Sequence, residues 1–183
     1  RANRIPAIPI YIDSPLATEA TSVFAMQPDV YDQGEAMVRS VQDLFEFDRL
    51  HYTKDVNESK ALNTQRGPMI IISASGMAEA GRILHHLKNG ASDPRNTILI
   101  VGFQAEHTLG RRIVERRDML RILGDEVPLR ARVEVLNGYS AHGDRAELTR
   151  WLDAVRGNET HPAPPTWLVH GEHPAQDALA HRL

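Results

Sequence analysis

The 183-residue sequence contains no cysteine. This absence excludes disulfide bonds, zinc sites built from thiolates and a cysteine nucleophile. Any metal ion would need histidine and carboxylate ligands instead. The chemistry of this chain therefore has to come from its nine histidines, its carboxylates and its hydroxyl groups.

Charge of one sign is not in large excess, because 21 basic residues face 24 acidic ones and the formal net charge is −3. Without a global positive field, any contact with nucleic acid has to be local. Long apolar runs are missing too, since no stretch of about 18 apolar residues suggests a membrane span. The opening RANRIPAIPIYID also lacks the apolar centre of a signal peptide. We expect a soluble, cytoplasmic protein without a membrane partner.

Both ends of the chain lack the features of a complete polypeptide. The first residue is Arg1 rather than methionine, and AHRL closes the chain inside a helical pattern. We therefore expect a piece of a longer protein.

Three apolar runs, each leading into small residues and then a helical pattern, determine the predicted fold. A hydrophobic content of 42% is sufficient for one sizeable core. Strand, loop and helix in this order predict parallel βαβ crossovers. We expect a three-layer α/β fold with a mainly parallel sheet and helices on both faces, because such apolar strands need cover on both sides. The three predicted strands are Ile8–Asp13, Met69–Ser73 and Thr97–Gly102.

The other elements follow from apolar spacing and turn residues. Strands are predicted at 50–53 and 167–170, and Gly124 with Asp125 joins two more at 119–123 and 127–137. Helices are predicted at 16–26, 29–45, 56–63, 79–88, 107–116 and 145–155, and from 174 onward.

Polar clusters stand at four predicted strand ends, where ligands bind in open α/β sheets. They are DSP at 13–15, SASGM at 73–77, GFQAEHTLG at 102–110 and VHGEH at 169–173. Backbone N–H groups at such loops hold anions, most often phosphate. For a single loop, ordinary turn and cap chemistry is the more common explanation, and no Walker or GxGxxG pattern supports a nucleotide. The candidate substrate contacts are Ser14, Ser75, Gly76, Thr108 and Gly110.

Two of the nine histidines stand apart from the rest. His142 lies in SAHGD ahead of a predicted helix, where Asp144 could cap the helix or hold an imidazole N–H. His170 follows an apolar run and precedes a glycine, as metal ligands often do. No HxH or HExxH is present, so these two histidines alone are too few for a zinc site, which needs at least three protein ligands. His85 and His86 are expected on a helix surface.

Five ordered motifs resemble one known family. GYSAHGD, followed 28 residues after His142 by His170 in WLVHGE, resembles the C-terminal part of the β-CASP group of the metallo-β-lactamase superfamily. IPIYIDSPLA, SASGM and GFQAEHTLGR resemble the strand-end motifs of that group's inserted β-CASP domain. The resemblance covers nearly the whole chain and is closest to the nuclease-type members, which include ribonuclease J.

The resemblance implies a zinc-dependent ribonuclease with two zinc ions. His142 would be the general acid or transition-state donor with Asp144 beside it, Ser140 of the SAH motif would contact RNA, and His170 would be a zinc ligand. Residues 1–136 would form the β-CASP domain and 137–183 the returning strand-helix segment of the metallo-β-lactamase domain. RNA and the N-terminal metallo-β-lactamase half of the same chain are the expected partners, and a homodimer is left open.

The departures from the family pattern bear on activity. The HxHxDH motif, which supplies most zinc ligands in the family, is absent from these residues. We therefore expect the chain alone to be inactive and to hold no zinc stably. The segment from Asn137 onward should pack as a separate layer or stay partly exposed. Unusual exposure of Trp167, Leu168 or Val169 would support this expectation. His107 stands where the family usually has glycine.

Two other functions remain open at this point. The chain could be a non-catalytic module of β-CASP fold that holds RNA or a protein. The βαβ pattern alone would also suit a Rossmann-like enzyme for small molecules, although it lacks a nucleotide fingerprint. The sequence upstream of Arg1 in the parent gene would separate enzyme from binding module.

Overall fold

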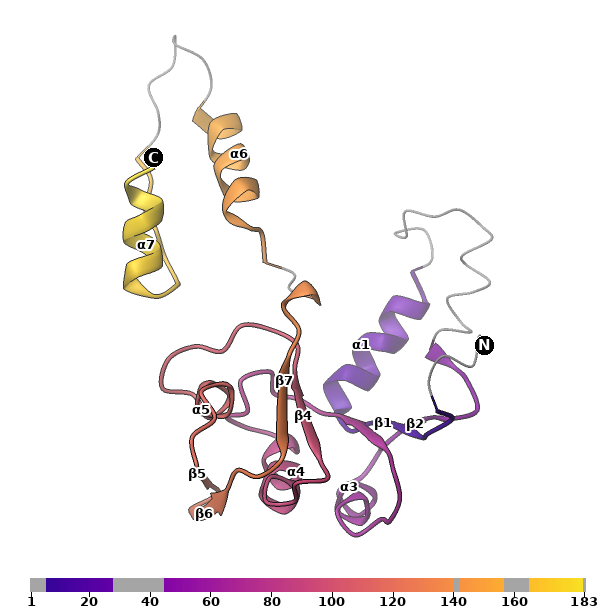
Figure 1. The fold of residues 1–183 in the computed structure, drawn as a ribbon. Coiled ribbons are helices and arrows are strands. Elements are labelled where there is room, and N and C mark those ends of the chain that lie inside the picture. Colours follow the sequence, from indigo (N-terminus) through magenta and orange to yellow (C-terminus); the bar gives the residue numbers. More distant parts are fainter. Residues whose placement is uncertain (1–5, 28–44, 140–141, 157–164, 183) are drawn as a thin grey trace.

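A computed structural model describes residues 6–27, 45–139, 142–156 and 165–182, and it has the α/β organisation that the sequence predicts (Figure 1). The helix predicted at 29–45 lies almost wholly outside the described residues. The strands are β1 (Ile10–Ile12), β2 (Leu50–Tyr52), β3 (Ile70–Ile72), β4 (Thr97–Ile100), β5 (Met119–Ile122), β6 (Asp125–Pro128) and β7 (Arg132–Val135). The helices are α1 (Pro15–Ala25), α3 (Val56–Leu62), α4 (Ile83–Gly90), α5 (Leu109–Val114), α6 (Arg145–Arg156) and α7 (His173–Ala180).

Five of these strands pair in parallel. β1 lies between β2 and β3, with Ile10 opposite Leu50 on one side and Ile70 on the other. The third predicted strand, β4, does not join this sheet and pairs in parallel with β7 instead. The expectation that all three apolar runs share one hydrogen-bonded sheet therefore needs correction. An apolar run identifies a strand, but its neighbour depends on contacts far along the chain.

The hairpin predicted around Gly124 is confirmed. β5 and β6 pair antiparallel, and the two turn residues Leu123 and Gly124 have φ values of 51° and 89°. Two successive left-handed residues are the mark of the type I′ turn that hairpins favour. The second arm is shorter than predicted, because the backbone N–H groups of Arg130 and Ala131 both donate to the carbonyl of Ala91. This contact interrupts the strand predicted at 127–137, whose residues belong instead to the end of β6 and to β7.

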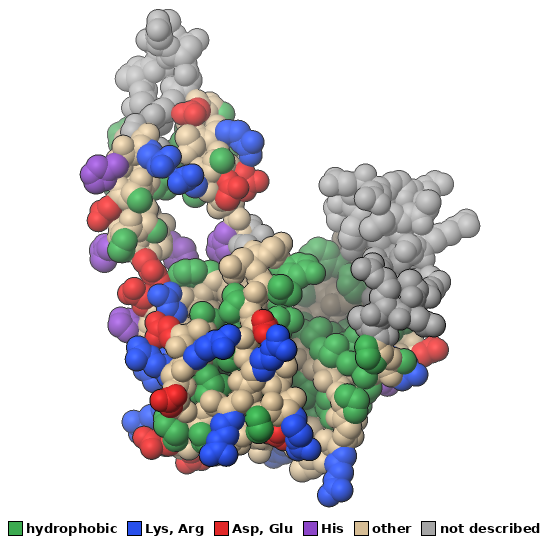
Figure 2. All heavy atoms as spheres, viewed as in Figure 1, with side chains coloured by type: hydrophobic (Ala, Val, Ile, Leu, Met, Phe, Trp, Pro, Cys, Tyr) green, Lys and Arg blue, Asp and Glu red, His purple; other side chains and the backbone are tan. Residues whose placement is uncertain are grey.

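The hydrophobic core lies between helices α4 and α5 and strands β4 to β7. Ile113 of α5 and Leu120 and Ile122 of β5 are completely buried at its centre. The opposite face of the β4–β7 pair, which carries Leu99 and Glu134, is less covered, since Leu99 is 50% exposed. Figure 2 shows hydrophobic side chains gathered on the surface between α1 and these strands. Basic and acidic side chains are mixed over the rest of this view, in keeping with the small net charge.

The segment after Asn137 lies apart from this core. Figure 1 shows α6 and α7 outside the body formed by α4, α5 and β4 to β7. Trp167 is 78% exposed and Val169 is 85% exposed, which confirms the expected exposure. The strand predicted at 167–170 is wrong, because residues 165–169 have no regular structure. A strand needs a neighbour for its backbone groups, and these residues pair with none in the described part of the chain. No helix within the described ranges is long and apolar enough to cross a membrane.

Candidate functional site

The carboxyl ends of β1, β2 and β3 meet at one edge, as parallel strands require. Asp13, Thr53 and Ser73 directly follow the three strands, and Asp13 and Thr53 are both buried. Their backbones are linked, since Asp13 N–H donates to Ile72 and Thr53 N–H donates to Ile12. The polar residues predicted at separate strand ends therefore lie together.

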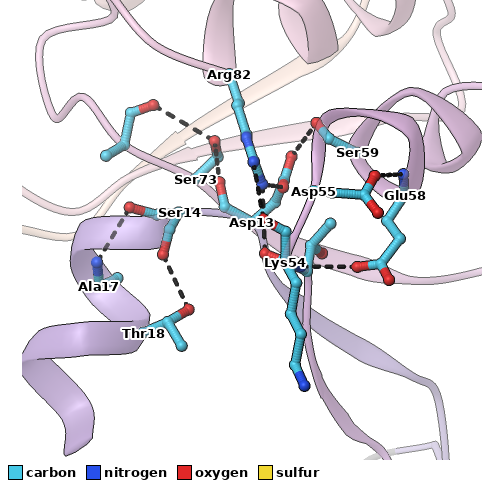
Figure 3. A network of polar contacts seen from close by, with 12 residues as sticks. Asp13, Ser14, Ala17, Thr18, Lys54, Asp55, Glu58, Ser59, Ser73 and Arg82 are labelled. Atoms are coloured by element: carbon cyan, nitrogen blue, oxygen red, sulfur yellow. Dashed lines mark hydrogen bonds and ion pairs between the residues drawn. The ribbon is translucent and has the colours of Figure 1, made fainter.

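Asp13 is the centre of the hydrogen-bond network at this edge. Its side chain has no exposed surface, and its two carboxylate oxygens accept from three side chains. Arg82 Nη1 donates to Oδ1 at 2.6 Å, while Ser59 Oγ and His86 Nε2 each lie 2.6 Å from Oδ2. The carbonyl oxygen of Asp13 accepts from Ser73 Oγ at 2.9 Å. Figure 3 shows Ser59 of α3, Ser73 at the end of β3 and Arg82 just before α4 around Asp13.

Helix α4 and the residue before it supply two of the three side-chain partners of Asp13. Arg82 and His86 are four residues apart and so lie on one helical face. Arg82 also donates to the carbonyl oxygens of Thr53, at 3.3 Å, and Lys54, at 3.4 Å. The other ring nitrogen of His86 lies 2.9 Å from Asn63 Oδ1. The expectation of His86 on the helix surface is wrong, because its side chain is only 8% exposed and is held by Asp13 and Asn63.

The environment of Asp13 favours its ionised form. Burial alone raises the pKa of the carboxyl group, but hydrogen bonds from Ser59, His86 and Arg82 and the charge of His86 lower it more. The net result is a pKa below the ordinary value of 3.8. A buried carboxylate paired in this way stabilises the folded state only while it is ionised.

The depressed pKa of Asp13 predicts a loss of stability in acid. Because the folded-state pKa is lower than the unfolded one, the stabilisation is complete above about pH 4 and is lost as the pH falls through the folded-state value. Urea unfolding from pH 6 to pH 2 should show this loss in the wild type. The difference in free energy of unfolding between wild type and Asp13→Asn should shrink over the same range.

Asp93 provides a matched control for this acid effect. Its hydrogen bonds with Arg95 lower its pKa to about 2, but the pair lies at the surface, where the side chain of Arg95 is 87% exposed and that of Asp93 is 31% exposed. Salt screens an exposed pair and has much less effect on a buried one. Added salt should therefore abolish the pH dependence attributable to Asp93 and leave that of Asp13. Equal sensitivity of both contributions to salt would contradict the burial argument.

Ser14, Ser75 and Gly76 occupy the loops next to this network. Ser14 is buried and caps helix α1, where its Oγ accepts from Ala17 N–H at 3.2 Å. Ser75 Oγ accepts weakly from the N–H groups of Glu79 and Ala80 at 3.3 and 3.4 Å. Gly76 is exposed, and no atom lies within 4 Å of the position a Cβ would take. Of these three candidates, Gly76 and Ser75 are open to a ligand, whereas Ser14 is engaged as a cap.

The loop before α5 packs directly against the SASGM loop. Gln104 is buried, and its Nε2 donates to the carbonyl of Gly76 at 2.9 Å. Gly110 N–H donates to Met77 at 3.0 Å. Thr108 caps α5 by accepting from Arg111 N–H at 3.1 Å, and its hydroxyl donates to Ala105. The structure thus joins the second and third predicted clusters.

Gly110 is required by the close approach of Gln104. A Cβ at Gly110 would lie 1.6 Å from Gln104 Oε1 and 3.0 Å from the carbonyl oxygen of Met77. Gly110→Ala should therefore lower the free energy of unfolding by about 1–3 kcal/mol through overpacking, although alanine is the better helix former. Gly102→Ala is the control, since no atom lies within 4 Å of its Cβ position. Equal unfolding midpoints in urea for both variants would show that Gln104 can move aside at no cost.

His142 and Asp144 precede helix α6, and Ser140 lies outside the described residues. His142 is exposed. Asp144 forms a capping box, in which Glu147 N–H donates to Asp144 Oδ1 at 2.9 Å and Asp144 N–H donates to Glu147 Oε2 at 2.8 Å. Of the two roles open to Asp144, the structure shows the cap. Its catalytic role stays a prediction.

His170 is exposed and has a left-handed backbone, with φ of 74°. Oε1 of Glu172, two residues later, lies 3.8 Å from Nη1 of Arg111, so the fourth predicted cluster contacts helix α5. Among the described residues, no group of three histidines or carboxylates could hold a metal ion. Zinc needs at least three protein ligands, so these residues do not build a zinc site by themselves.

Asp13 was predicted only as part of the DSP cluster, and Arg82, His86 and Gln104 were missed as site residues. The spacing of Arg82 and His86 on one face of a helix was available in the sequence, but nothing local showed that this face is buried. For Gln104 the only signal is its place between Gly102 and Thr108 in a polar loop.

Comparison with protein families assigns both parts of the chain. The Beta-Casp domain model matches residues 1–113, which contain the strand-end network. The chain belongs to the Beta-Casp family. A second model, the Zn-dependent metallo-hydrolase RNA specificity domain, matches residues 126–183 and includes His142 and His170. The resemblance inferred from the motifs is confirmed, and the family assignment argues against the Rossmann-like alternative.

Several curated relatives align over most of this Beta-Casp chain. Ribonuclease TTHA0252 of Thermus thermophilus is 41% identical over 93% of the chain and 38% of its own length. Transcription termination factor FttA of Pyrococcus abyssi is 32% identical over 92% of the chain and 27% of its own length. An RNase J-like protein of Methanocaldococcus jannaschii is 30% identical over 94% of the chain and 38% of its own length. The chain therefore spans well under half the length of these relatives.

Proposed function

We propose that the protein containing this chain is a zinc-dependent ribonuclease that hydrolyses RNA phosphodiester bonds, and that this chain holds the RNA and supplies part of the catalytic residues. The observation that carries the proposal is the succession of a Beta-Casp domain and an RNA specificity domain along one chain. The relatives named ribonuclease and RNase J-like protein support it. RNA is the substrate class that these names share.

The strand-end edge has the chemistry for binding single-stranded RNA. The loops at 73–77 and 102–110 are joined by Gln104 and Gly110, and exposed Gly76 leaves backbone accessible to a phosphate. Phe103, in the second loop, is 60% exposed and offers a face on which a base can stack. Phosphate contact and stacking together suit an unpaired RNA strand better than a duplex.

His142 is the proposed proton donor. An imidazole beside a phosphodiester can protonate the leaving oxygen or donate to a phosphoryl oxygen as charge develops. His142 is exposed just before α6, and this exposure supports the proposal because a proton donor has to reach the RNA. His170 is proposed as a zinc ligand, with the remaining ligands supplied from outside the 183 residues.

The chain itself should bind zinc weakly. His170 contributes a single imidazole, and no described group adds the two further ligands that a stable site requires. Isothermal titration of the chain with zinc should show no tight one-to-one binding. Tight binding that is lost in His170→Ala would mean that these residues build a site of their own.

Binding of RNA by the chain is the direct test of the proposal. Fluorescence anisotropy with a labelled single-stranded RNA should show saturable binding that weakens as salt increases. Gly76→Asp places a negative charge on the SASGM loop, where its side chain has space, and should weaken binding by on the order of tenfold. Asn89→Asp adds the same charge about two helical turns from Arg82 and should have little effect. Absence of RNA binding by the folded wild type would overturn the proposed function.

The RNA-holding module without catalysis is the second candidate, since the strand-end edge proposed to hold RNA lies within the Beta-Casp match at residues 1–113, which contains neither His142 nor His170. Both candidates predict RNA binding. Cleavage of the same RNA by the complete protein, in the presence of zinc, separates them.

A further inference from the structure

The buried Asp13 network connects the carboxyl ends of β1, β2 and β3 with α3 and α4, and it includes Ser73, the first residue of the SASGM loop at the proposed RNA edge. The carboxylate of Asp13 receives Ser59 from α3 and both Arg82 and His86 from the α4 region. The guanidinium of Arg82 continues the network to the backbone at the end of β2 through Thr53 and Lys54. Asp13 and Arg82 thus link the carboxyl ends of β1 and β2. Ser73 Oγ links the end of β3 to them by donating to the Asp13 carbonyl. Figure 3 shows Arg82 reaching between Asp13 and the Lys54 backbone.

The strands themselves are too short to fix this edge. β1, β2 and β3 have three residues each, so each pair contributes few ladder hydrogen bonds. Ser14 follows Asp13 directly, and Ser75 lies two residues after Ser73. A shift of Asp13 or Ser73 would therefore move both loops that border the edge.

A buried ion pair is a costly way to obtain stability alone. Removing two charges from water offsets much of their attraction, and apolar residues of similar size often stabilise as well. Directed hydrogen bonds have a different effect, since they fix the relative position of the groups they join. Asp13, Arg82 and His86 form such hydrogen bonds beside the loops that border the proposed RNA edge.

We propose that Arg82 and His86 are positioning residues, which act through Asp13 to hold the Ser14 and Ser75 loops in the geometry that binds RNA. The proposal rests on the proposed function of the edge. Arg82 is the more informative of the two, because its planar guanidinium reaches Asp13, Thr53 and Lys54 at once. A lysine can keep the charge beside Asp13 but cannot reproduce this fork.

The test compares Arg82→Lys with wild type at a temperature where thermal melts show both to be folded. Anisotropy with the labelled single-stranded RNA should give a Kd about tenfold higher for Arg82→Lys. In ¹H–¹⁵N spectra without RNA, the amide signals of Ser14 and Ser75 should move. Arg95→Lys is the matched control, since Arg95 pairs with Asp93 on the exposed surface and should change neither readout. If Arg82→Lys fails to fold, His86→Gln takes its place in both measurements.

A purely structural network would change only the melting temperature. Wild-type Kd in a folded variant with unmoved Ser14 and Ser75 signals would overturn the positioning role, and so would a change in one readout without the other. If wild-type chain binds no RNA, the proposed function fails while the amide signals alone decide whether Arg82 positions the loops.

Discussion

Asp13→Ala is expected to lower the free energy of unfolding by about 3–5 kcal/mol, the usual cost of removing one partner from a buried ion pair. The substitution leaves Arg82 and His86 without their carboxylate, and their side chains are only 18% and 8% exposed. Urea unfolding followed by circular dichroism measures the change.

Asp55→Ala is the matched control for this loss. Asp55 also accepts hydrogen bonds through its carboxylate, from Asn57 N–H and Glu58 N–H, but it is an exposed helix cap. Removal of such a cap costs about 1 kcal/mol. If Asp13→Ala costs no more than Asp55→Ala, the network is not the stabilising centre described above.

The second large effect is expected at His142 in the complete protein. His142→Ala should lower kcat by on the order of 10²- to 10⁴-fold, the range for loss of a general acid. Zinc content and KM should change little, because the imidazole is proposed to act as the bond breaks and not to hold metal or substrate. Single-turnover cleavage of a labelled RNA and metal analysis provide the two measurements.

His170→Ala and His85→Ala are the comparison variants for this result. His170→Ala should first reduce zinc content, with activity partly restored by added zinc, because loss of a ligand weakens metal affinity. His85 is exposed on α4, and its replacement should leave kcat unchanged. Cleavage by His142→Ala at the wild-type rate would contradict the assignment of the proton donor.

Local patterns were sufficient to predict most strands and helices. The apolar runs at β1, β3 and β4 and the turn at Gly124 depend on neighbouring residues, and the structure contains all four features. Pairing could not be predicted in the same way. The partner of β4 is β7, and β7 is separated from β6 by a contact with Ala91 at the end of α4. The failed strand at 167–170 has the same cause, since an apolar run forms a strand only beside a partner.

The sequence predicted the polar clusters at the strand ends but not the buried side chains that hold them together. The DSP cluster at 13–15 was predicted because polar residues directly follow an apolar run and parallel strands bring such ends together, but the candidate named there was Ser14 and not Asp13. Arg82 and His86 could not be assigned, since their helical spacing is equally consistent with a solvated face. Gly110 illustrates the same limit. Only the position of Gln104 in the folded chain shows that there is no room for a side chain at this residue. For His142 and His170, the family motif was more informative than any local pattern.

Photo-crosslinking of the chain to a 4-thiouridine-labelled single-stranded RNA tests the central claim most directly. Mass spectrometry of the crosslinked peptides locates the RNA on the surface. We expect crosslinks in residues 73–79 and 102–110, with Phe103 among the modified positions, and a loss of these crosslinks in Gly76→Asp. Crosslinks confined to the β5–β6 hairpin or to α3, or a pattern unchanged by Gly76→Asp, would contradict an RNA-binding edge at the carboxyl ends of the strands.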